Sequence, residues 1–239
     1  MEHPYAIIQK VLTNQFATLR MRTTLRGKSR SRIAMFHDIC EDNAVPADEY
    51  ACSLQTLIAC VDRHLDFGFS FVPLDKFLSL PQRQAKYGCC VLTFDDGYTS
   101  IDSIVAPYLF AREIPFTIYL ITGQIGQPGY LTQTQIRSLA ENPLCTIGSH
   151  SVSHSMMRFQ GKTAVDYELL ESRRILEQII GKPVQHFAFP YGSAYACSSR
   201  NLYQCKLAGY TSAMLTTPTV YSRFPYGHFS LPRLNLPQL

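Results

Sequence analysis

The sequence lacks three features that would place it in particular classes of protein. It contains no CxxC pair of cysteines, which argues against a zinc site built from thiolates. No apolar run approaches the roughly 20 residues of a membrane-spanning helix. The apolar pairs Ile7-Ile8 and Val11-Leu12 are too short for a secretory signal. Internal repeats and low-complexity stretches are also absent, which argues against a repeat architecture.

What is present is typical of a single folded domain. The chain has 239 residues, 46% of them hydrophobic, with 14 Phe and 14 Tyr, and this composition excludes a wholly disordered protein. A chain of this length can bury a sizeable core without disulfides or a structural metal. We therefore expect one main domain over 33–239, preceded by an N-terminal helix and basic arm over 1–32.

The positive charge is concentrated in that arm. Residues 1–32 contain seven basic residues and one acidic residue, whereas residues 33–239 contain fifteen basic and seventeen acidic ones. The arm is interpreted as binding an anionic membrane surface, because each clustered Lys or Arg contributes about 1 kcal/mol there. The alternative is a solvated, flexible terminus. No recognition motif accompanies the arm, which argues against nucleic-acid binding.

The eight cysteines are interpreted as buried, reduced thiols. Cys40, Cys52 and Cys60 are expected in or near helix, and Cys89 and Cys90 in a core strand. Free thiols and the lack of an export signal favour a reducing compartment. The expected location is therefore cytoplasmic, with peripheral contact at the inner membrane face through the arm.

Strand and helix patterns alternate along the chain. This alternation predicts an α/β fold with a parallel sheet or barrel, whose active site would gather at the carboxyl ends of the strands. Strands are expected at 33–36, 71–74, 89–94, 116–120, 145–148, 187–189 and 210–215, and helices at 1–19, 48–67, 75–80, 99–112, 131–140, 163–180 and 198–208.

Two clusters with metal-binding chemistry follow predicted strands. Asp95 and Asp96 come directly after the apolar run 89–94, and a carboxylate in such a place needs a partner or a metal. His150 and His154 follow strand 145–148, four residues apart. One Asp and two His make a three-ligand site with a position left for water, as in hydrolytic zinc enzymes. The alternatives are a helix-capping Asp and two surface histidines.

A third cluster follows strand 187–189. Pro190 has no N–H, and the N–H of Tyr191 could point into a site as a donor to an oxyanion. A simple turn after the strand is the alternative reading of this motif alone.

Together these motifs resemble those of the polysaccharide deacetylase family, the NodB-homology family of carbohydrate esterases (family 4). The resemblance rests on Thr93-Phe94-Asp95-Asp96-Gly97, His150-Ser151-x-x-His154 and Phe187-Ala188-Phe189-Pro190-Tyr191-Gly192, in this order. It implies a distorted (β/α)7 barrel and a divalent metal, usually Zn²⁺.

The resemblance also implies roles for individual residues. Asp96, His150 and His154 would be the metal ligands, and Asp95 the catalytic base. The backbone N–H of Tyr191 would contact the oxyanion. The implied reaction is metal-dependent removal of N-acetyl groups from an amino sugar, in a polysaccharide or a lipid-linked glycan precursor. A metal hydrolase of another amide or ester, and a silent carbohydrate-binding module, are the alternatives.

The sequence departs from the family pattern in three ways. Ala188 stands where the family usually has an Arg that steadies the catalytic Asp, and Arg233 is the candidate replacement. The family's Asp/Trp motif is not identifiable, and the chain has no Trp. The His-Asp motif expected near the C-terminus resembles Ile33–Asp38 instead, as in the circularly permuted branch that acts on exopolysaccharides such as poly-N-acetylglucosamine. His37 would then be the general acid, with His228 as its rival.

Overall fold

The computed structural model describes residues 30–41, 50–81, 85, 87–217 and 227–235. The expected N-terminal helix at 1–19 and nearly all of the basic arm lie outside these residues. The first strand of the main domain begins at Arg32.

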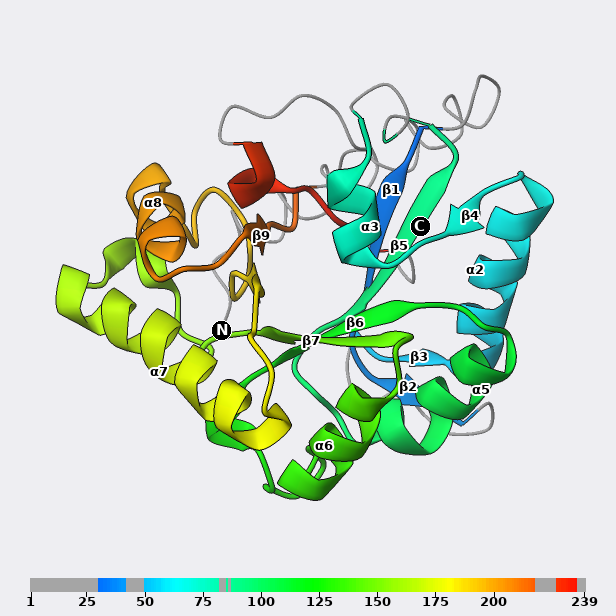
Figure 1. Cartoon of the computed structure of the whole chain (residues 1–239), viewed down its shortest axis with the longest axis horizontal. Helices are drawn as coiled ribbons and strands as arrows, with labels where there is room; N and C mark the ends of the chain where they lie inside the picture. Colours follow the sequence, from blue (N-terminus) through cyan, green and yellow to red (C-terminus); the bar gives the residue numbers. More distant parts are fainter. Residues whose placement is uncertain (1–29, 42–49, 82–84, 86, 218–226, 236–239) are drawn as a thin grey trace, which may run out of the picture.

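Eight strands form one curled, wholly parallel sheet at the centre of the molecule (Figure 1). Seven of them follow one path, and β4 (Ser70–Phe71) pairs with β5 as the eighth. The path closes toward a barrel because Leu231, just before its first strand, bridges to Met214 in its last. In order, the path is β10 (Leu234–Asn235), β1 (Arg32–Phe36), β5 (Cys89–Phe94), β6 (Phe116–Leu120), β7 (Cys145–Ser149), β8 (His186–Ala188) and β9 (Ser212–Met214).

Helices surround the outside of this sheet (Figure 1). A separate two-stranded ladder joins β2 (Ile39–Cys40) to β3 (Cys52–Ser53). The helices are α2 (Leu54–Asp66), α3 (Leu74–Ser79), the π-helix η1 (Ile101–Val105) that continues into α5 (Ala106–Ala111), α6 (Gln133–Glu141), α7 (Lys162–Ile180) and α8 (Ser199–Leu207), and the 3₁₀ turns are η2 (Thr122–Gln124), η3 (Met157–Phe159) and η4 (Gly227–Ser230).

The two faces of β5 explain how the sheet is packed. Alternate side chains point to opposite faces of a strand. Leu92 and Phe94 belong to the large apolar cluster between the sheet and the outer helices. Val91 faces the barrel interior, where Phe77 from α3 packs in a second cluster. A strand buried on both faces must be apolar throughout, as the run 89–94 is. The predicted NodB-like distorted barrel is confirmed.

Local signals placed some helix ends correctly and others not. The helices expected at 131–140 and 163–180 are confirmed as α6 and α7. Thr132 caps α6 in a capping box with Gln135, and Gly181 ends α7 at φ 66°. The helix expected from Asp48 was wrong at its start, because Cys52 pairs with β2 and the Ser53 hydroxyl caps α2 by accepting from the Thr56 N–H. Cys40 and Cys52 therefore lie in strands and not in helix.

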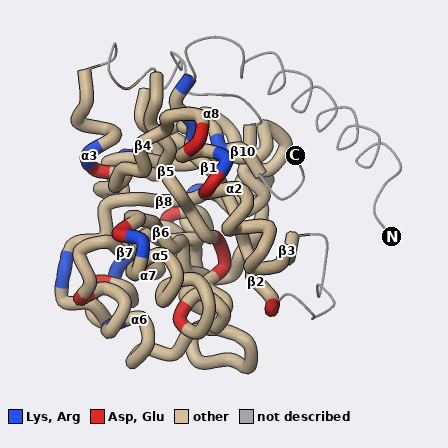
Figure 2. Tube along the Cα trace, turned by 90° about the vertical axis from the view of Figure 1, so that its right-hand side faces the viewer, with Lys and Arg blue, Asp and Glu red and all other residues tan. Residues whose placement is uncertain are grey.

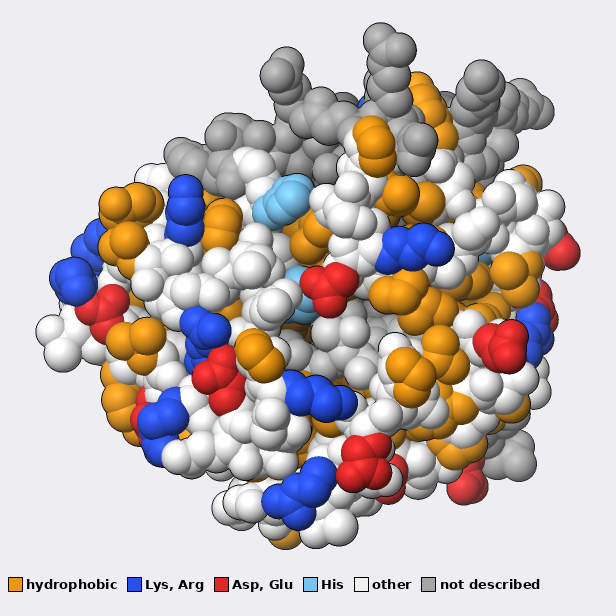
Figure 3. Space-filling model, viewed as in Figure 1, with side chains coloured by type: hydrophobic (Ala, Val, Ile, Leu, Met, Phe, Trp, Pro, Cys, Tyr) orange, Lys and Arg blue, Asp and Glu red, His pale blue; other side chains and the backbone are white. Residues whose placement is uncertain are grey.

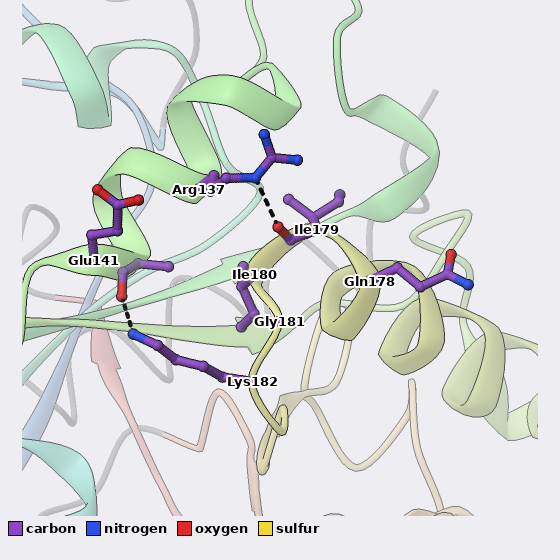
Figure 4. Close-up of a pocket in the computed structure, with 8 residues that line it drawn as sticks. Arg137, Glu141, Gln178, Ile179, Ile180, Gly181 and Lys182 are labelled. Atoms are coloured by element: carbon purple, nitrogen blue, oxygen red, sulfur yellow. Dashed lines mark hydrogen bonds between the residues drawn. The ribbon is translucent and has the colours of Figure 1, made fainter.

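A shallow cavity lies between the C-terminal ends of α6 and α7 (Figure 4). Two cations bridge these helix ends. Arg137 of α6 donates to the Ile179 carbonyl of α7 at 3.2 Å, and Lys182, just beyond α7, donates to the Ala140 carbonyl of α6 at 2.8 Å. Cations are stabilising at the negative end of a helix dipole. This exchange locks the two helices together at the ends that lead into β7 and β8.

The cysteines and the surface charges of the domain are distributed as follows. All eight cysteines are free thiols, and five of them are buried. Acidic and basic residues are interspersed over the described surface, on the trace in Figure 2 and on the face in Figure 3. Among the described helices, none combines the length and the apolar character needed to cross a membrane.

Candidate active site

The polar motifs converge because they follow strands of one parallel sheet. Asp95 and Asp96 follow β5, His150 follows β7, and Tyr191 is the third residue after β8. The carboxyl ends of parallel strands meet at the same end of a barrel. The structure thus brings together residues that the sequence separates widely.

Asp96, His150 and His154 form a compact cluster. One ligand atom from each lies within 4.8 Å of the others. The Oδ1 atom of Asp96 is 3.5 Å from the Nε2 atoms of both histidines. A carboxylate and two imidazoles are donors that zinc accepts, with room left for further ligands. The donor set therefore fits a divalent metal.

Unusual backbone conformations hold these side chains in place. Among the described residues, five non-glycine residues have positive φ, and four of them belong to the site motifs. Such conformations cost about 1 kcal/mol or more each and persist only where the surroundings enforce them. Gly97 shows this enforcement, since a Cβ there would lie 2.5 Å from the Leu120 side chain. The four are Asp96, Ser151, His154 and Tyr191.

Hydrogen bonds orient the two histidines. The Nδ1 atom of His150 lies 2.7 Å from the Ala188 carbonyl, which leaves Nε2 to face Asp96. A partner of this kind commonly fixes the tautomer of a metal-binding histidine. The Ser151 hydroxyl accepts from the His154 N–H at 3.0 Å. Below this loop, the buried Glu168 of α7 accepts from the N–H groups of Val152 and Ser153.

Burial keeps both histidines in the neutral form that a metal requires. Desolvation lowers the pKa of His150 to about 3, against the opposing attraction of Asp95. Desolvation likewise lowers the pKa of His154. At neutral pH their imidazoles therefore offer lone pairs, as neutral metal ligands must.

Asp95 is buried, with 2% of its surface exposed, and is held by Arg233. The two Nη atoms of Arg233 donate to the two carboxylate oxygens at 2.5 and 2.6 Å. Desolvation is the largest single influence and would raise the pKa of Asp95. The charge and hydrogen bonds of Arg233, together with His150 and His37, outweigh it, and the pKa falls to about 2. Arg233, the candidate to replace the missing family Arg, therefore contacts Asp95 directly. The pairing is the bidentate kind that orients a carboxylate firmly.

The structure separates the two candidate acids. His37 directly follows β1, which pairs with β5, and its charge helps to lower the pKa of Asp95. Its ring lies 5.0 Å from that of Tyr50. His228 lies in η4, exposed, and precedes the parallel strand β10. His37, and not His228, is among the charges that act on Asp95.

Tyr191 lies in a tightly held turn, and its ring packs against His154 of the cluster. Its φ is 60°, and its carbonyl accepts from the Thr216 hydroxyl at 2.6 Å, whereas its N–H donates to no other described residue. The next residue, Gly192, packs so closely on Thr216 that a Cβ would lie 2.5 Å from the Thr216 nitrogen. The turn is thereby fixed with one backbone donor left available.

Comparison with known proteins places the chain. A model of the polysaccharide deacetylase family matches residues 82–213, which is more than half of the sequence. The chain belongs to the polysaccharide deacetylase family. The matched range contains Asp95, Asp96, both histidines and Tyr191. His37 and Arg233 lie outside it.

One sequence relative and two solved structures resemble this polysaccharide deacetylase. YxkH of Bacillus subtilis (strain 168), assigned by name to the polysaccharide deacetylases, is 26% identical over 208 residues, which are 85% of this chain and 70% of YxkH. IcaB from Ammonifex degensii superposes with a TM-score of 0.73 at 20% identity, covering 87% of this chain and 94% of IcaB. A de-N-acetylase from Aggregatibacter actinomycetemcomitans gives 0.72 at 18%, covering 86% and 94%.

Sequence reasoning missed some residues that build the site. Glu168 holds the His150–His154 loop, and its signal was an acid on the apolar stripe of a predicted helix, between Val165 and Leu169. Ser100 anchors Asp38, next to His37, through a 2.6 Å hydrogen bond. That contact carried no sequence signal, because it joins two loops distant in the chain. Two histidines outside the site are buried with partners of their own: His64 bonds to the Cys60 carbonyl, and His186 bonds to Asp75 and Ser212.

Proposed function

We propose that this polysaccharide deacetylase is a metal-dependent hydrolase that removes N-acetyl groups from an amino sugar, in a polysaccharide or a lipid-linked glycan precursor. The observation that carries the proposal is an ionised, oriented carboxylate, Asp95, buried directly beside an Asp-His-His cluster. Amide hydrolysis needs both a base for water and a group that stabilises the oxyanion. The site offers candidates for each.

Asp96, His150 and His154 would hold the metal ion, with zinc the best match to one carboxylate and two imidazoles. A bound divalent ion would supply Lewis acidity and lower the pKa of a water molecule toward neutrality. In the proposal all three side chains act as ligands. None of them takes part in proton transfer.

The remaining residues handle the proton and the developing charge. Asp95 accepts the proton of the attacking water, and Arg233 keeps its carboxylate oriented and ionised. The Tyr191 N–H donates to the oxyanion that forms from the acetyl carbonyl. His37 donates a proton to the departing amine, a role in which a positioned imidazole commonly serves as general acid. Acetate and a free amino sugar result.

Two solved neighbours support the proposed chemistry. The A. actinomycetemcomitans protein is a de-N-acetylase, and PplD of Streptococcus pyogenes is a deacetylase seen in complex with acetate. PplD superposes with a TM-score of 0.73 at 19% identity. For this chain, N-deacetylation and acetate as product are inferences from the family together with the site.

Acetate release from a panel of N-acetylated glycans, with and without chelator, tests the proposal. We expect release that chelator abolishes and added Zn²⁺ restores, metal bound in about equal amount to protein, and a loss of about a thousandfold in Asp95→Asn. Near-normal deacetylation by Asp95→Asn would overturn the role of Asp95. Turnover of other amides or esters but no acetylated sugar would favour the other hydrolase. Sugar binding without any turnover would favour the silent module.

The proposed contact of the arm with an anionic membrane rests on the charge of residues 1–29. Arg32 does not contribute, because its side chain is buried in β1. Co-sedimentation with anionic liposomes, for the full chain and for a variant lacking residues 1–29, tests this contact. Equal pelleting of the two proteins would remove it.

A further inference from the structure

We infer that Phe159 and Tyr195 form a second sugar-binding subsite beside the catalytic site, which stacks on a pyranose ring of a glycan several residues long. The inference rests on the proposed function and narrows it: the substrate is an oligomer or polymer of amino sugars and not a single lipid-linked sugar. Neither residue belongs to the motifs that suggested the family.

The pair is unusual because both rings are left in water. The ring centroids lie 5.3 Å apart at an interplanar angle of 64°, and each side chain is 67% exposed. Single exposed aromatics are ordinary, but adjacent ones form an apolar patch, and such patches mark binding sites more often than chance. Leaving two aromatic rings exposed to water does not stabilise the fold.

Hydrogen bonds hold the two rings together although they come from different loops. Phe159 ends η3, and Tyr195 lies in the loop after β8. Arg158 joins these loops: its N–H donates to the Ala196 carbonyl at 2.9 Å, and its Nη1 donates to the Ala194 carbonyl at 2.6 Å. The aromatic pair therefore sits on a preorganised support, which reduces the entropy lost on binding.

The same loops lead directly to the catalytic site. The loop of Phe159 begins at His154, and Gln160 donates to the hydroxyl of Ser155, next to that histidine, at 2.6 Å. The loop of Tyr195 begins at Tyr191, whose half-exposed ring lies 4.9 Å from the His154 ring. A chain bound with one acetamide at the metal cluster could thus extend over Tyr191 toward the pair.

The chemistry around the pair favours a neutral sugar. Aromatic faces carry negative partial charge and attract the weakly positive C–H groups on the face of a pyranose. Two arginines of these loops direct N–H groups at backbone carbonyls, Arg158 at Ala194 and Arg200 at Gln160, the latter at 2.7 Å. A neutral N-acetylated glycan requires only the ring faces.

The absence of tryptophan from the chain makes a direct binding test possible. Tyr195→Trp introduces the only Trp of the chain at the subsite, and it can be excited apart from the tyrosines. An Asp95→Asn background prevents turnover. We expect the hexamer of N-acetylglucosamine, in β-1,4 or β-1,6 linkage, to shift the Trp emission and saturate. The dimer at equal sugar concentration should leave it unchanged. Phe67→Trp, at an exposed position beyond the C-terminal end of α2, is the matched control.

Kinetics on the full chain provide the second test. We expect the ratio of kcat/KM on the hexamer to kcat/KM on the dimer to fall about tenfold in Phe159→Ala/Tyr195→Ala, a loss typical of one aromatic contact. Tyr195→Phe should keep the ratio, because stacking needs the ring and not the hydroxyl.

The two failures are distinguishable. If the wild type releases acetate but the double variant keeps the ratio, and Trp at 195 responds to neither oligomer, the subsite is wrong and the proposed function stands. If the wild type releases no acetate from any sugar, the proposed function fails, and the Trp titration alone decides the subsite.

Discussion

Among the residues that the structure describes, two arginines are almost completely buried, and their surroundings differ in one decisive way. Arg233 and Arg32 are each about 1% exposed, and each guanidinium lies over an aromatic ring, at 5.4 Å from Tyr119 and 4.4 Å from Phe69. Arg233 donates to both oxygens of Asp95. All three side-chain nitrogens of Arg32 lack a hydrogen-bond partner.

The comparison shows that burial alone does not make a charge functional. Arg233 lies at the site end of the barrel, where its charge keeps Asp95 ionised. Arg32 begins β1 and faces the layer between the sheet and α2, beside Cys60 and Cys90, where desolvation lowers its pKa. A buried charge without a partner costs several kcal/mol. We expect one arginine to support activity and the other to lower stability.

The largest effect should follow Arg233→Met. The substitution leaves the buried Asp95 carboxylate without its charge partner, which should destabilise the folded protein by about 3–5 kcal/mol. It also frees that carboxylate to move, and such misplacement costs about a hundredfold in rate. Urea unfolding and acetate release measure the two losses.

Two companion variants show whether charge is the cause. Arg233→Lys should recover part of both losses, since it restores the charge without the paired geometry. In an Asp95→Asn background the destabilisation by Arg233→Met should shrink, because no carboxylate is left stranded. Equal destabilisation in both backgrounds would mean that Arg233 acts by packing.

The second effect has the opposite sign. Arg32→Met replaces an unpartnered buried charge by an apolar side chain of similar length, and such exchanges have stabilised proteins by about 1–4 kcal/mol. We expect a higher urea midpoint with unchanged acetate release. Arg32→Ala serves as the control for volume, since it removes the charge but leaves a cavity that offsets the gain. A less stable Arg32→Met protein would contradict the comparison.

Of the two buried arginines, the sequence predicted a role only for Arg233. Ala188 stands where the family motif has an Arg, and Arg233 was the candidate to replace it. The strand 89–94 was placed correctly because its apolar run ends sharply at two aspartates. Both signals are local in the chain.

What the sequence did not reveal depends on contacts between distant segments. Arg32 was grouped with the basic, membrane-binding arm, since nothing near it in the sequence shows that Phe69 would cover it. Strand β10 is only Leu234–Asn235, too short for a periodic pattern, and forms because β1 offers it an edge. The Phe159–Tyr195 pair exists only once η3 meets the loop after β8.

The smallest expected effect is on the pH dependence of stability and involves His64, a neighbour of Arg32. Burial lowers the pKa of His64 from 6.5 to about 4, and the nearby charge of Arg32 contributes in the same direction. Because the folded pKa lies below the unfolded one, the stability from neutral His64 is complete above pH 6.5. It is lost as the pH falls toward 4, by about 3 kcal/mol in all. Arg32→Met should raise the pKa of His64, so this variant should lose less stability than the wild type as the pH falls.

The stabilisation by Arg32→Met should therefore be larger at pH 5 than at pH 7. Urea unfolding at the two pH values measures the difference, and titration of the His64 ring by NMR measures the pKa directly. In a His64→Gln background the gain should no longer depend on pH, because the titrating ring is absent. A gain that stays the same at both pH values with His64 present would show that the two side chains are not coupled. Arg32 would then lower stability only through its own desolvation.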